Sequence, residues 1–173
     1  KLNAPLDTFI VRKVGVPGHE ELAMGAVASG GVAVSNCGVI RGLHVPLDVF
    51  DGVAEQERRE IERREELYRG HRPGLAIEGR TTILVDDGLA TGASMRAAVA
   101  AVGQQRPRRL VVAVPVAARA TAEQFRQLVD HFVSVLEPDE LDGVGRWYED
   151  FRQTTDEEVR QLLDARARAT TPR

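Results

Sequence analysis

The stretch Thr82-Ile-Leu-Val-Asp-Asp-Gly-Leu-Ala-Thr-Gly-Ala-Ser94 joins an apolar run, two adjacent acids and a loop of small residues. Residues 82–85 predict a strand that is buried on both faces of a parallel sheet, because their apolar character does not alternate. Residues 94–103 are rich in alanine and predict a helix, with Ser94 near its N-cap and Gly103 near its end. The stretch therefore predicts a strand, a turn and a helix in direct succession.

The chain after this stretch continues the same alternation. Residues 110–116 and 131–136 are rich in β-branched side chains and predict two more strands. Between them, Thr121 and Gln124 have the spacing of a capping box, which predicts the start of a helix. Strands that alternate with helices favour right-handed crossovers. The expected fold class is therefore α/β, with a mainly parallel twisted sheet flanked by helices.

The chain before the stretch carries three further elements. Residues 7–14 predict a strand, and residues 24–35 contain two strand-like pieces separated by Gly30-Gly31, which predicts a hairpin. Residues 55–69 are dense in Glu and Arg at spacings of three and four, which favours a largely solvated helix. Two glycines and a proline make residues 70–74 a flexible loop.

The length of 173 residues suits one domain. A capping box at Thr155 and Glu158 predicts a last helix that runs to about residue 168. We therefore expect a single domain over residues 1–168. Residues 169–173 are expected to form a frayed tail or the stub of a linker to a fused second domain.

Composition excludes several classes of protein. Lys and Arg total 23 against 26 Asp and Glu, and the net charge of −3 argues against a nucleic-acid partner. The chain has no apolar run near the ~20 residues that span a membrane, and no signal peptide opens it. A single cysteine excludes a framework of intramolecular disulfides. The expected location is the cytoplasm.

The acids and the small-residue loop predict two different kinds of contact with one ligand. Small residues let backbone amides surround an anion, and the N-terminus of the following helix adds a favourable dipole. Thr91 and Ser94 can donate hydroxyl hydrogen bonds to the same anion. Asp86 and Asp87 would repel a phosphate, so they are suited to accept hydrogen bonds from neutral hydroxyls or to hold a divalent metal through water. A ribose 5-phosphate meets both demands.

These thirteen residues resemble the phosphoribosyl diphosphate (PRPP) motif of the type I phosphoribosyltransferases. The chain is similar to a bacterial group of proteins with this domain, some of which are fused to hydrolase domains. The resemblance implies a Rossmann-like fold, Mg²⁺ bound with PRPP, and contacts from Asp86 and Asp87 to the ribose 2′- and 3′-hydroxyls, with Mg²⁺ bridged to these acids by water. It also implies a 5′-phosphate cradle made of Ala90, Thr91, Gly92, Ala93 and Ser94.

Two cations near the first strand are candidates for the catalytic site. In the family, basic residues at this strand end help to hold pyrophosphate, so the resemblance implies this role for Arg12 and Lys13. Arg offers a forked donor and Lys a point charge. Alternation along a strand points the two side chains to opposite faces, so only one of them is expected to reach the ligand. The alternative is a pair of solvated cations.

Two other regions carry weaker predictions. Family members have a mobile loop that closes over the reacting centre, and residues 69–74 fit such a lid, although a solvated loop charge is the favoured interpretation of any single charged residue there. Trp147, Tyr148 and Phe151 form the aromatic cluster near the end of the chain. An aromatic residue there could stack on a base, but anchoring of the last helix on the core is the favoured interpretation.

The chain departs from the family at two places. Ala90 stands where members acting on 6-oxopurines carry an Asp, so a 6-oxopurine acceptor is disfavoured. The earlier strand with an Arg-Gly-Gly-like pyrophosphate loop is not found before Asp7, so the sheet is expected to lack its first strand. Either the chain is a fragment, or the element was lost together with activity. A sheet shortened in this way exposes an apolar edge or face, which favours a homodimer.

Three functions are compatible with these features. The first is a Mg²⁺-dependent phosphoribosyltransferase that transfers ribose 5-phosphate from PRPP to a nucleobase-like acceptor and releases pyrophosphate. The second is a non-catalytic module that binds PRPP or a nucleotide and regulates or assists another enzyme. The third is a structural domain whose cradle binds only phosphate or sulfate.

Overall fold

A computed structural model describes residue 2 and residues 4–170, except for the side chain of Thr170. The chain divides into two compact units, Ala76–Arg152 and a second unit made of Lys1–Leu75 with Gln153–Arg173. The single domain over residues 1–168 stays a prediction. The last helix continues to Thr170, and residues 171–173 of the expected tail lie outside the described residues.

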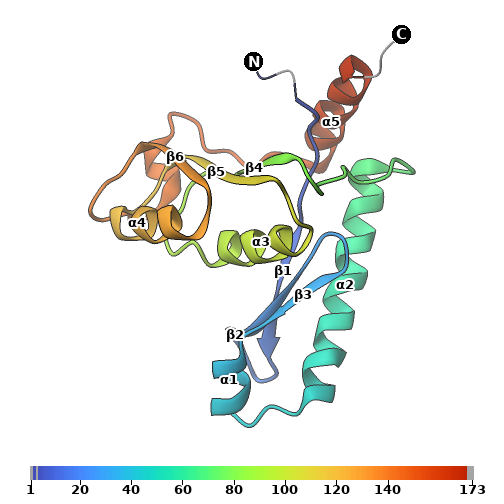
Figure 1. The fold of residues 1–173 in the computed structure, drawn as a ribbon, viewed down its shortest axis with the longest axis vertical. Coiled ribbons are helices and arrows are strands. Elements are labelled where there is room, and N and C mark those ends of the chain that lie inside the picture. The colour runs from blue at the N-terminus through green and yellow to red at the C-terminus, as the bar shows by residue number, and fades with distance from the viewer. Residues whose placement is uncertain (1, 3, 171–173) are drawn as a thin grey trace. The chain divides into compact units, whose positions relative to one another are not determined.

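The unit Ala76–Arg152 is built on a parallel sheet. Its strands β4 (Thr81–Val85), β5 (Arg109–Val116) and β6 (His131–Leu136) lie in the order β4-β5-β6. The crossovers contain α3 (Ala93–Gln104) and α4 (Arg119–Leu128), and both helices lie on the same side of the sheet (Figure 1). The predicted α/β class, with a parallel sheet flanked by helices, is confirmed.

Within the unit Ala76–Arg152, α3 and α4 cover one face of this sheet (Figure 1). Leu84, Val112 and Val114 are buried together with Phe125 of α4. On the other face four large apolar side chains are exposed, namely Ile83 (42%), Val85 (73%), Val133 (52%) and Val135 (79%). The prediction that residues 82–85 are buried on both faces is therefore wrong. Two right-handed crossovers that advance in the same direction place both of their helices on one face.

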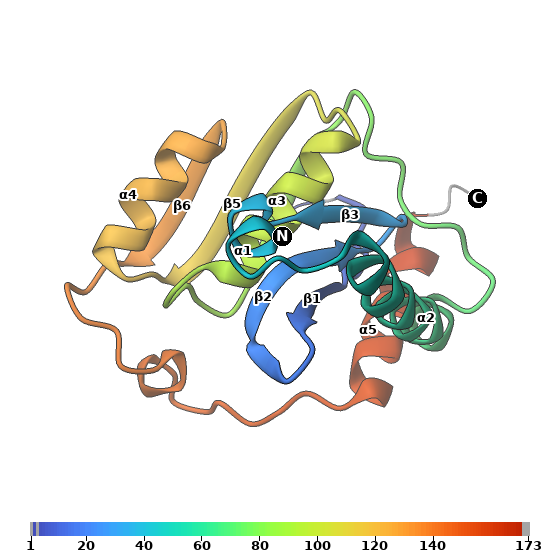
Figure 2. The same ribbon diagram turned by 90° about the horizontal axis from the view of Figure 1, so that it is seen from below.

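The other unit begins with an antiparallel sheet. Strands β1 (Val11–Val16), β2 (His19–Ala28) and β3 (Val32–Ser35) lie in the order β1-β2-β3, with β2 in the middle (Figure 2). The predicted hairpin at Gly30-Gly31 is confirmed, and both glycines have positive φ values, of 82° and 76°. Short turns such as this one join antiparallel strands. The molecule therefore has an antiparallel sheet in addition to the expected parallel one.

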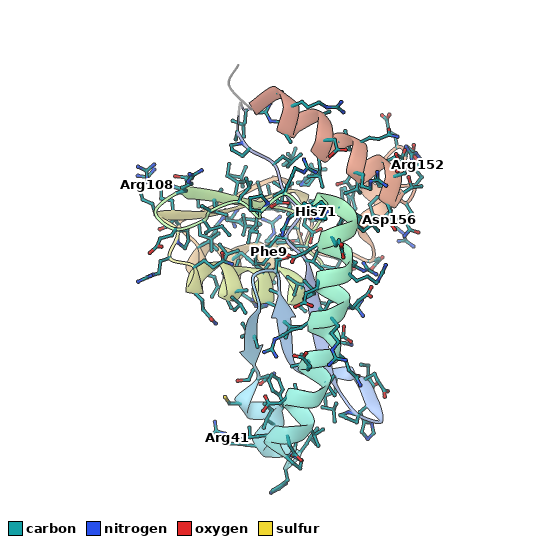
Figure 3. All side chains as sticks on the ribbon, turned by 90° about the vertical axis from the view of Figure 1, so that its right-hand side faces the viewer. Phe9, Arg41, His71, Arg108, Arg152 and Asp156 are labelled. Atoms are coloured by element: carbon teal, nitrogen blue, oxygen red, sulfur yellow. The ribbon has the colours of Figure 1, made fainter. Side chains whose placement is uncertain are left out.

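Two helices, α1 (Cys37–Gly42) and α2 (Leu47–Arg69), follow this sheet. Helix α2 begins eight residues before the predicted helix, directly after Pro46. Its buried residues Phe50, Ala54 and Ile61 pack in one cluster with the sheet. The first half of the helix therefore has an apolar side that the prediction missed. Charged side chains project from the helix along its length (Figure 3).

The C-terminal helix α5 (Asp156–Thr170) belongs to the same unit as α2. The amide of Glu158 donates to Oγ1 of Thr155, and the amide of Thr155 donates to the Glu158 carboxylate, at 3.2 and 2.9 Å. The capping box predicted here is confirmed. None of the described helices is long and apolar enough to cross a membrane.

Candidate ligand-binding site

The motif loop, residues 86–92, runs from the end of β4 to the start of α3. Leu89 attaches it to the neighbouring strand, since its amide donates to the Val116 carbonyl and its carbonyl accepts from the Ala118 amide, both at 2.9 Å. The loop therefore lies at the carboxyl ends of the parallel strands. In open α/β sheets this is the edge at which ligands bind.

Gly92 gives the loop its sharp turn into α3. It is the N-cap residue of the helix and has a left-handed backbone conformation, with a φ of 69°. A Cβ atom here would lie 2.6 Å from Cε2 of Phe125, so the position needs glycine for two reasons. The N-cap glycine has no side chain that could cap the helix. Amides of the first helical turn have no partner within the helix, so those of Ala93 and Ser94 are suited to an anion.

Thr91, Ala93 and Ser94 are exposed around this turn. The Thr91 hydroxyl accepts a long hydrogen bond of 3.4 Å from the Ala93 amide. The five residues of the predicted phosphate cradle thus lie on one turn at the N-terminus of a helix, where Gly92 is buried and the other four are exposed. Their contact with a phosphate stays a prediction.

Two residues of α4 support the loop in place of capping their own helix. The Thr121 hydroxyl donates to the Ala90 carbonyl at 2.6 Å, and the Gln124 side chain accepts from Arg96 at 2.6 Å. Helix α4 begins at Arg119 and has no side-chain cap. The predicted capping box at Thr121 and Gln124 is therefore wrong, because both side chains are engaged by the motif loop and α3.

Arg96 is a site residue that the sequence analysis missed. Its guanidinium donates to the Thr91 carbonyl at 3.2 Å and lies 5.1 Å from the centre of the Phe125 ring. A cation over an aromatic face is attracted by the ring quadrupole. The arginine therefore ties the cradle to α4, and only the spacing of Arg96 one turn after Gly92 could have indicated this role.

The acid pair follows β4 directly. Asp86 and Asp87 are both exposed, and the Asp87 amide donates to Oδ1 of Asp86 at 3.0 Å. Partial burial of its carboxyl group raises the pKa of Asp86; the Asp87 amide acts in the opposite direction, and the Asp87 carboxylate adds to the rise. Both carboxylates can accept hydrogen bonds from a bound molecule.

The aromatic cluster lies against the motif loop. The Tyr148 hydroxyl donates to the Asp87 carbonyl at 2.6 Å, and the ring centres of Tyr148 and Phe151 are 5.0 Å apart. A Cβ atom on Gly88 would lie 2.7 Å from Cγ1 of Val144, which shows how closely this segment approaches. Tyr148 therefore contacts the backbone of the motif loop, and the favoured interpretation, in which Trp147, Tyr148 and Phe151 anchor the last helix, stays a prediction.

Arg12 and Lys13 point to opposite faces of β1, as alternation predicts. Arg12 is half-buried and forms an ion pair of 2.6 Å with Glu57 of α2, whereas Lys13 is exposed. Both belong to the unit Lys1–Leu75, and the motif loop belongs to Ala76–Arg152. Their joint action on one ligand stays a prediction, and Lys13 is the better candidate because Glu57 already neutralises Arg12.

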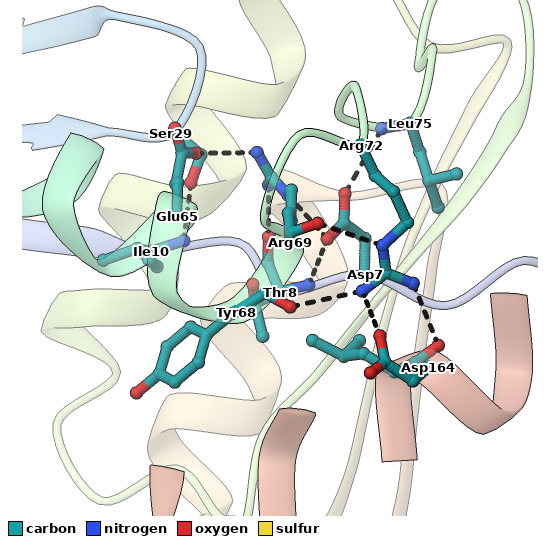
Figure 4. A network of polar contacts seen from close by, with 11 residues as sticks. Asp7, Thr8, Ile10, Ser29, Glu65, Tyr68, Arg69, Arg72, Leu75 and Asp164 are labelled. Carbon is teal, nitrogen blue, oxygen red and sulfur yellow. Dashed lines mark hydrogen bonds and ion pairs between the residues drawn. The ribbon is translucent and has the colours of Figure 1, made fainter. Parts of the chain in front are cut away.

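The residues of the expected lid form a polar network around the end of α2 (Figure 4). Arg69 is largely buried and pairs with Asp7 at 2.7 Å and with Glu65 at 3.0 Å. Arg72 pairs with Asp164 of α5 at 2.8 Å. These arginines therefore stabilise their own unit, which argues against a mobile lid made from them.

Among the residues that the structure describes, no three His, Cys, Asp or Glu side chains are grouped to hold a metal ion. The exposed Asp86 and Asp87 offer two adjacent carboxylates. Such a pair fits a Mg²⁺ ion that keeps several waters and takes further oxygens from a phosphorylated substrate.

The chain belongs to the phosphoribosyl transferase domain family, whose model matches residues 17–142. Proteins of two Mycobacterium tuberculosis strains, CDC 1551 and H37Rv, are both named "Putative phosphoribosyl transferase" and are each 39% identical over 163 residues, or 94% of this chain. The chain spans 37% of the length of these curated relatives. The crystal structure of TT1426 from Thermus thermophilus is similar in fold, with a TM-score of 0.81 and 42% identity over 94% of this chain and 76% of that chain.

Proposed function

We propose that the protein is a phosphoribosyltransferase that uses Mg-PRPP and transfers ribose 5-phosphate to a nucleobase-like acceptor, with release of pyrophosphate. The observation that carries the proposal is the succession of an exposed acid pair, a clamped loop and an uncapped helix N-terminus at the carboxyl end of a parallel strand. Membership of the phosphoribosyl transferase domain family supports it.

The acid pair and the cradle bind different parts of the sugar phosphate. Asp86 and Asp87 accept hydrogen bonds from the ribose 2′- and 3′-hydroxyls. The amides of residues 92–94 and the hydroxyls of Thr91 and Ser94 donate to the 5′-phosphate, which the α3 dipole also favours. The ribose is thereby held at both ends, and its anomeric carbon is fixed in place for reaction.

In the reaction, the bond from the anomeric carbon to the pyrophosphate oxygen breaks and a bond to an acceptor nitrogen forms. The nitrogen's proton passes to solvent, because Ala90 offers no basic group where a proton acceptor would stand. Mg²⁺ bound with PRPP supplies charge neutralisation for the departing pyrophosphate. Lys13 adds positive charge for the same group, and Arg12 does so only if it leaves Glu57.

A non-catalytic PRPP-binding module is the second candidate function. It is favoured by the ion pair between Arg12 and Glu57, which occupies one of the two cations proposed for pyrophosphate. Such a module would keep the cradle and the acid pair, because these are enough to bind the sugar phosphate, and would lack turnover.

One experiment separates these two functions. The protein is incubated with Mg-PRPP and a panel of purine, pyrimidine and related nitrogen bases, and nucleotide formation is followed by mass spectrometry. A nucleotide formed with stoichiometric pyrophosphate supports the transferase. PRPP binding without any product supports the module, and the absence of both contradicts the proposed use of the site.

We also propose that the protein is a homodimer. The apolar face formed by Ile83, Val85, Val133 and Val135 supports this proposal, since exposed apolar patches often mark interfaces. The curated relatives are longer than the matched stretch, which supports a further domain working beside this one. The cytoplasmic location stays a prediction.

A further inference from the structure

We propose that Tyr148 is a positioning residue for the ribose-binding acids, and that residues 144–148 form a strap that holds the acid pair in its binding geometry. The inference rests on the proposed function, because it assigns the acids to ribose. It adds a segment that follows β6 and lies about sixty residues after the motif loop in the sequence.

The first contact of the strap fixes the backbone of Asp87 from both sides. The Tyr148 hydroxyl donates to the Asp87 carbonyl at 2.6 Å, while the Asp87 amide donates to Oδ1 of Asp86 at 3.0 Å. The amide therefore directs one acid of the pair, and the tyrosine holds the residue that carries this amide. Loss of the phenol leaves Asp87 free to rotate, and the direction of both carboxylates changes with it.

The second contact places Val144 against the next residue of the loop. A Cβ atom on Gly88 would lie 2.7 Å from Cγ1 of Val144 and 3.0 Å from Cγ1 of Val116. Gly88 is therefore enclosed between the strap and the end of β5. Two successive loop residues are in this way fixed by the same short segment.

The strap is itself stiffened by an aromatic pair. Its central part is a 3₁₀ turn, Val144–Trp147, followed directly by Tyr148. The Tyr148 ring lies 5.0 Å from the Phe151 ring, and a Cβ atom on Gly145 would lie 2.7 Å from Cδ1 of Phe151. A braced segment can hold its hydroxyl in one place at little cost in conformational entropy.

The phenol is well suited to remain a donor. Burial raises the pKa of Tyr148, and the carboxylates of Asp87 and Asp86 raise it further. The hydroxyl therefore keeps its proton at neutral pH and can donate to the Asp87 carbonyl. The single tryptophan of the sequence, Trp147, is the neighbouring residue and is 44% exposed, so its fluorescence reports on the strap.

The test is Tyr148→Phe, which removes the hydroxyl and keeps the ring. We expect the Kd for PRPP, measured by calorimetry with Mg²⁺, to rise about fivefold, the worth of one hydrogen bond. The Kd for inorganic phosphate should stay within about twofold, since the Tyr148 hydroxyl bonds Asp87, several residues before Thr91 and Ser94 in the loop. In the wild type, PRPP should change Trp147 fluorescence, and this change should shrink in the variant.

The chain offers a matched control in Tyr68→Phe. Tyr68 also donates a hydroxyl hydrogen bond, of 2.7 Å to Asp156, and it belongs to the other unit. The control should bind both ligands as the wild type does. If Tyr148→Phe binds PRPP as tightly as the control, or loses PRPP and phosphate equally, the positioning role is overturned while the proposed function stands. Failure of the wild type to bind PRPP overturns both.

Discussion

Gly92 occupies a backbone conformation that other residues adopt only with strain, and it does so where the proposed phosphate site meets α3. We expect Gly92→Ala to lower the free energy of unfolding by about 1–3 kcal/mol, the usual cost of a left-handed residue. The 2.6 Å approach of the new Cβ to Phe125 adds to this strain. Phosphate affinity should fall as well, because the cradle must shift. Urea unfolding and calorimetry with phosphate measure the two effects.

Gly103 supplies the control within the same helix. A Cβ atom there meets nothing within 4 Å, and its φ is not positive. Gly103→Ala should therefore raise the free energy of unfolding, by up to about 1 kcal/mol, and leave phosphate binding unchanged. Equal behaviour of the two variants would contradict the role assigned to Gly92.

The raised pKa of Asp86 predicts that the stability of the protein depends on pH. Partial burial raises its pKa in the folded state, so ionisation is harder in the folded protein than in the unfolded one. Below the ordinary Asp pKa of about 4, which applies to the unfolded chain, the carboxyl group is protonated in both states and does not change the free energy of unfolding. As the pH rises through the raised pKa of the folded state, the free energy of unfolding falls. Asp86→Asn should therefore raise the Tm at neutral pH and have little effect near pH 3.

Thermal unfolding across this pH range measures the difference, with Asp51→Asn, at an exposed position of α2, as the control for loss of one carboxylate. A Tm gain that is the same at both ends of the range would contradict the assignment to Asp86. The ribose contact itself should weaken as the pH falls through the same pKa, because a protonated acid accepts hydrogen bonds less well.

At the scale of single residues, a local sequence pattern predicted a contact correctly only where the partners are neighbours in the sequence. Thr155 and Glu158 form their capping box because both groups lie within one turn of each other at the start of α5. Thr121 and Gln124 have the same pattern, but the Ala90 carbonyl and Arg96 engage them. The contact of Tyr148 with the Asp87 carbonyl was not predicted either, since the two residues lie about sixty positions apart in the sequence.

At the scale of elements, β1 and α2 separate the roles of the two adjacent cations. Arg12 joins the strand to the helix through Glu57, whereas Lys13 is exposed on the opposite face. We expect Arg12→Ala to lower the free energy of unfolding by about 0.5–1 kcal/mol, the range for a partly exposed ion pair. Lys13→Ala should leave stability unchanged and weaken binding of Mg-PRPP.

Urea unfolding and calorimetry with Mg-PRPP applied to both variants test this separation. The reverse result, in which Arg12→Ala weakens PRPP binding and Lys13→Ala does not, would show that the arginine leaves Glu57 to hold the ligand. The contact between β1 and α2 would then be part of the site.

The alternation of strands and helices was visible in the sequence, because it follows from the period of the apolar residues. Which face of the sheet each helix covers was not visible, and Ile83 and Val85 were consequently predicted to be buried. The start of α2 was also missed, since Phe50 and Ala54 read as apolar helix residues only once their partners in β1 and β2 are known.

At the scale of the whole molecule, the chain is two compact units, and the family match over residues 17–142 includes parts of both. The family could be recognised from thirteen residues, because the acid pair and the cradle are contiguous. Lys13 belongs to the other unit and is distant in sequence from the motif. Its proposed contribution to the site therefore cannot be recognised from a contiguous motif.

The exposed apolar face of the parallel sheet yields a prediction about assembly. We expect the wild type to sediment as a homodimer and Val135→Asp to sediment as a monomer, because a buried unpaired carboxylate is costly. Leu162→Asp, at an exposed position on α5, is the control and should not change the sedimentation coefficient. A monomeric wild type would contradict the homodimer.

The central claim is tested most directly by the double variant Asp86→Asn with Asp87→Asn, titrated with Mg-PRPP and, separately, with inorganic phosphate. The account predicts that PRPP affinity falls at least about tenfold, because charged acceptors of hydroxyl hydrogen bonds are lost. Phosphate affinity should be unchanged or higher, since two negative charges near the cradle are removed. If both ligands lose affinity together, the division between acids that hold the ribose and a cradle that holds the phosphate is wrong.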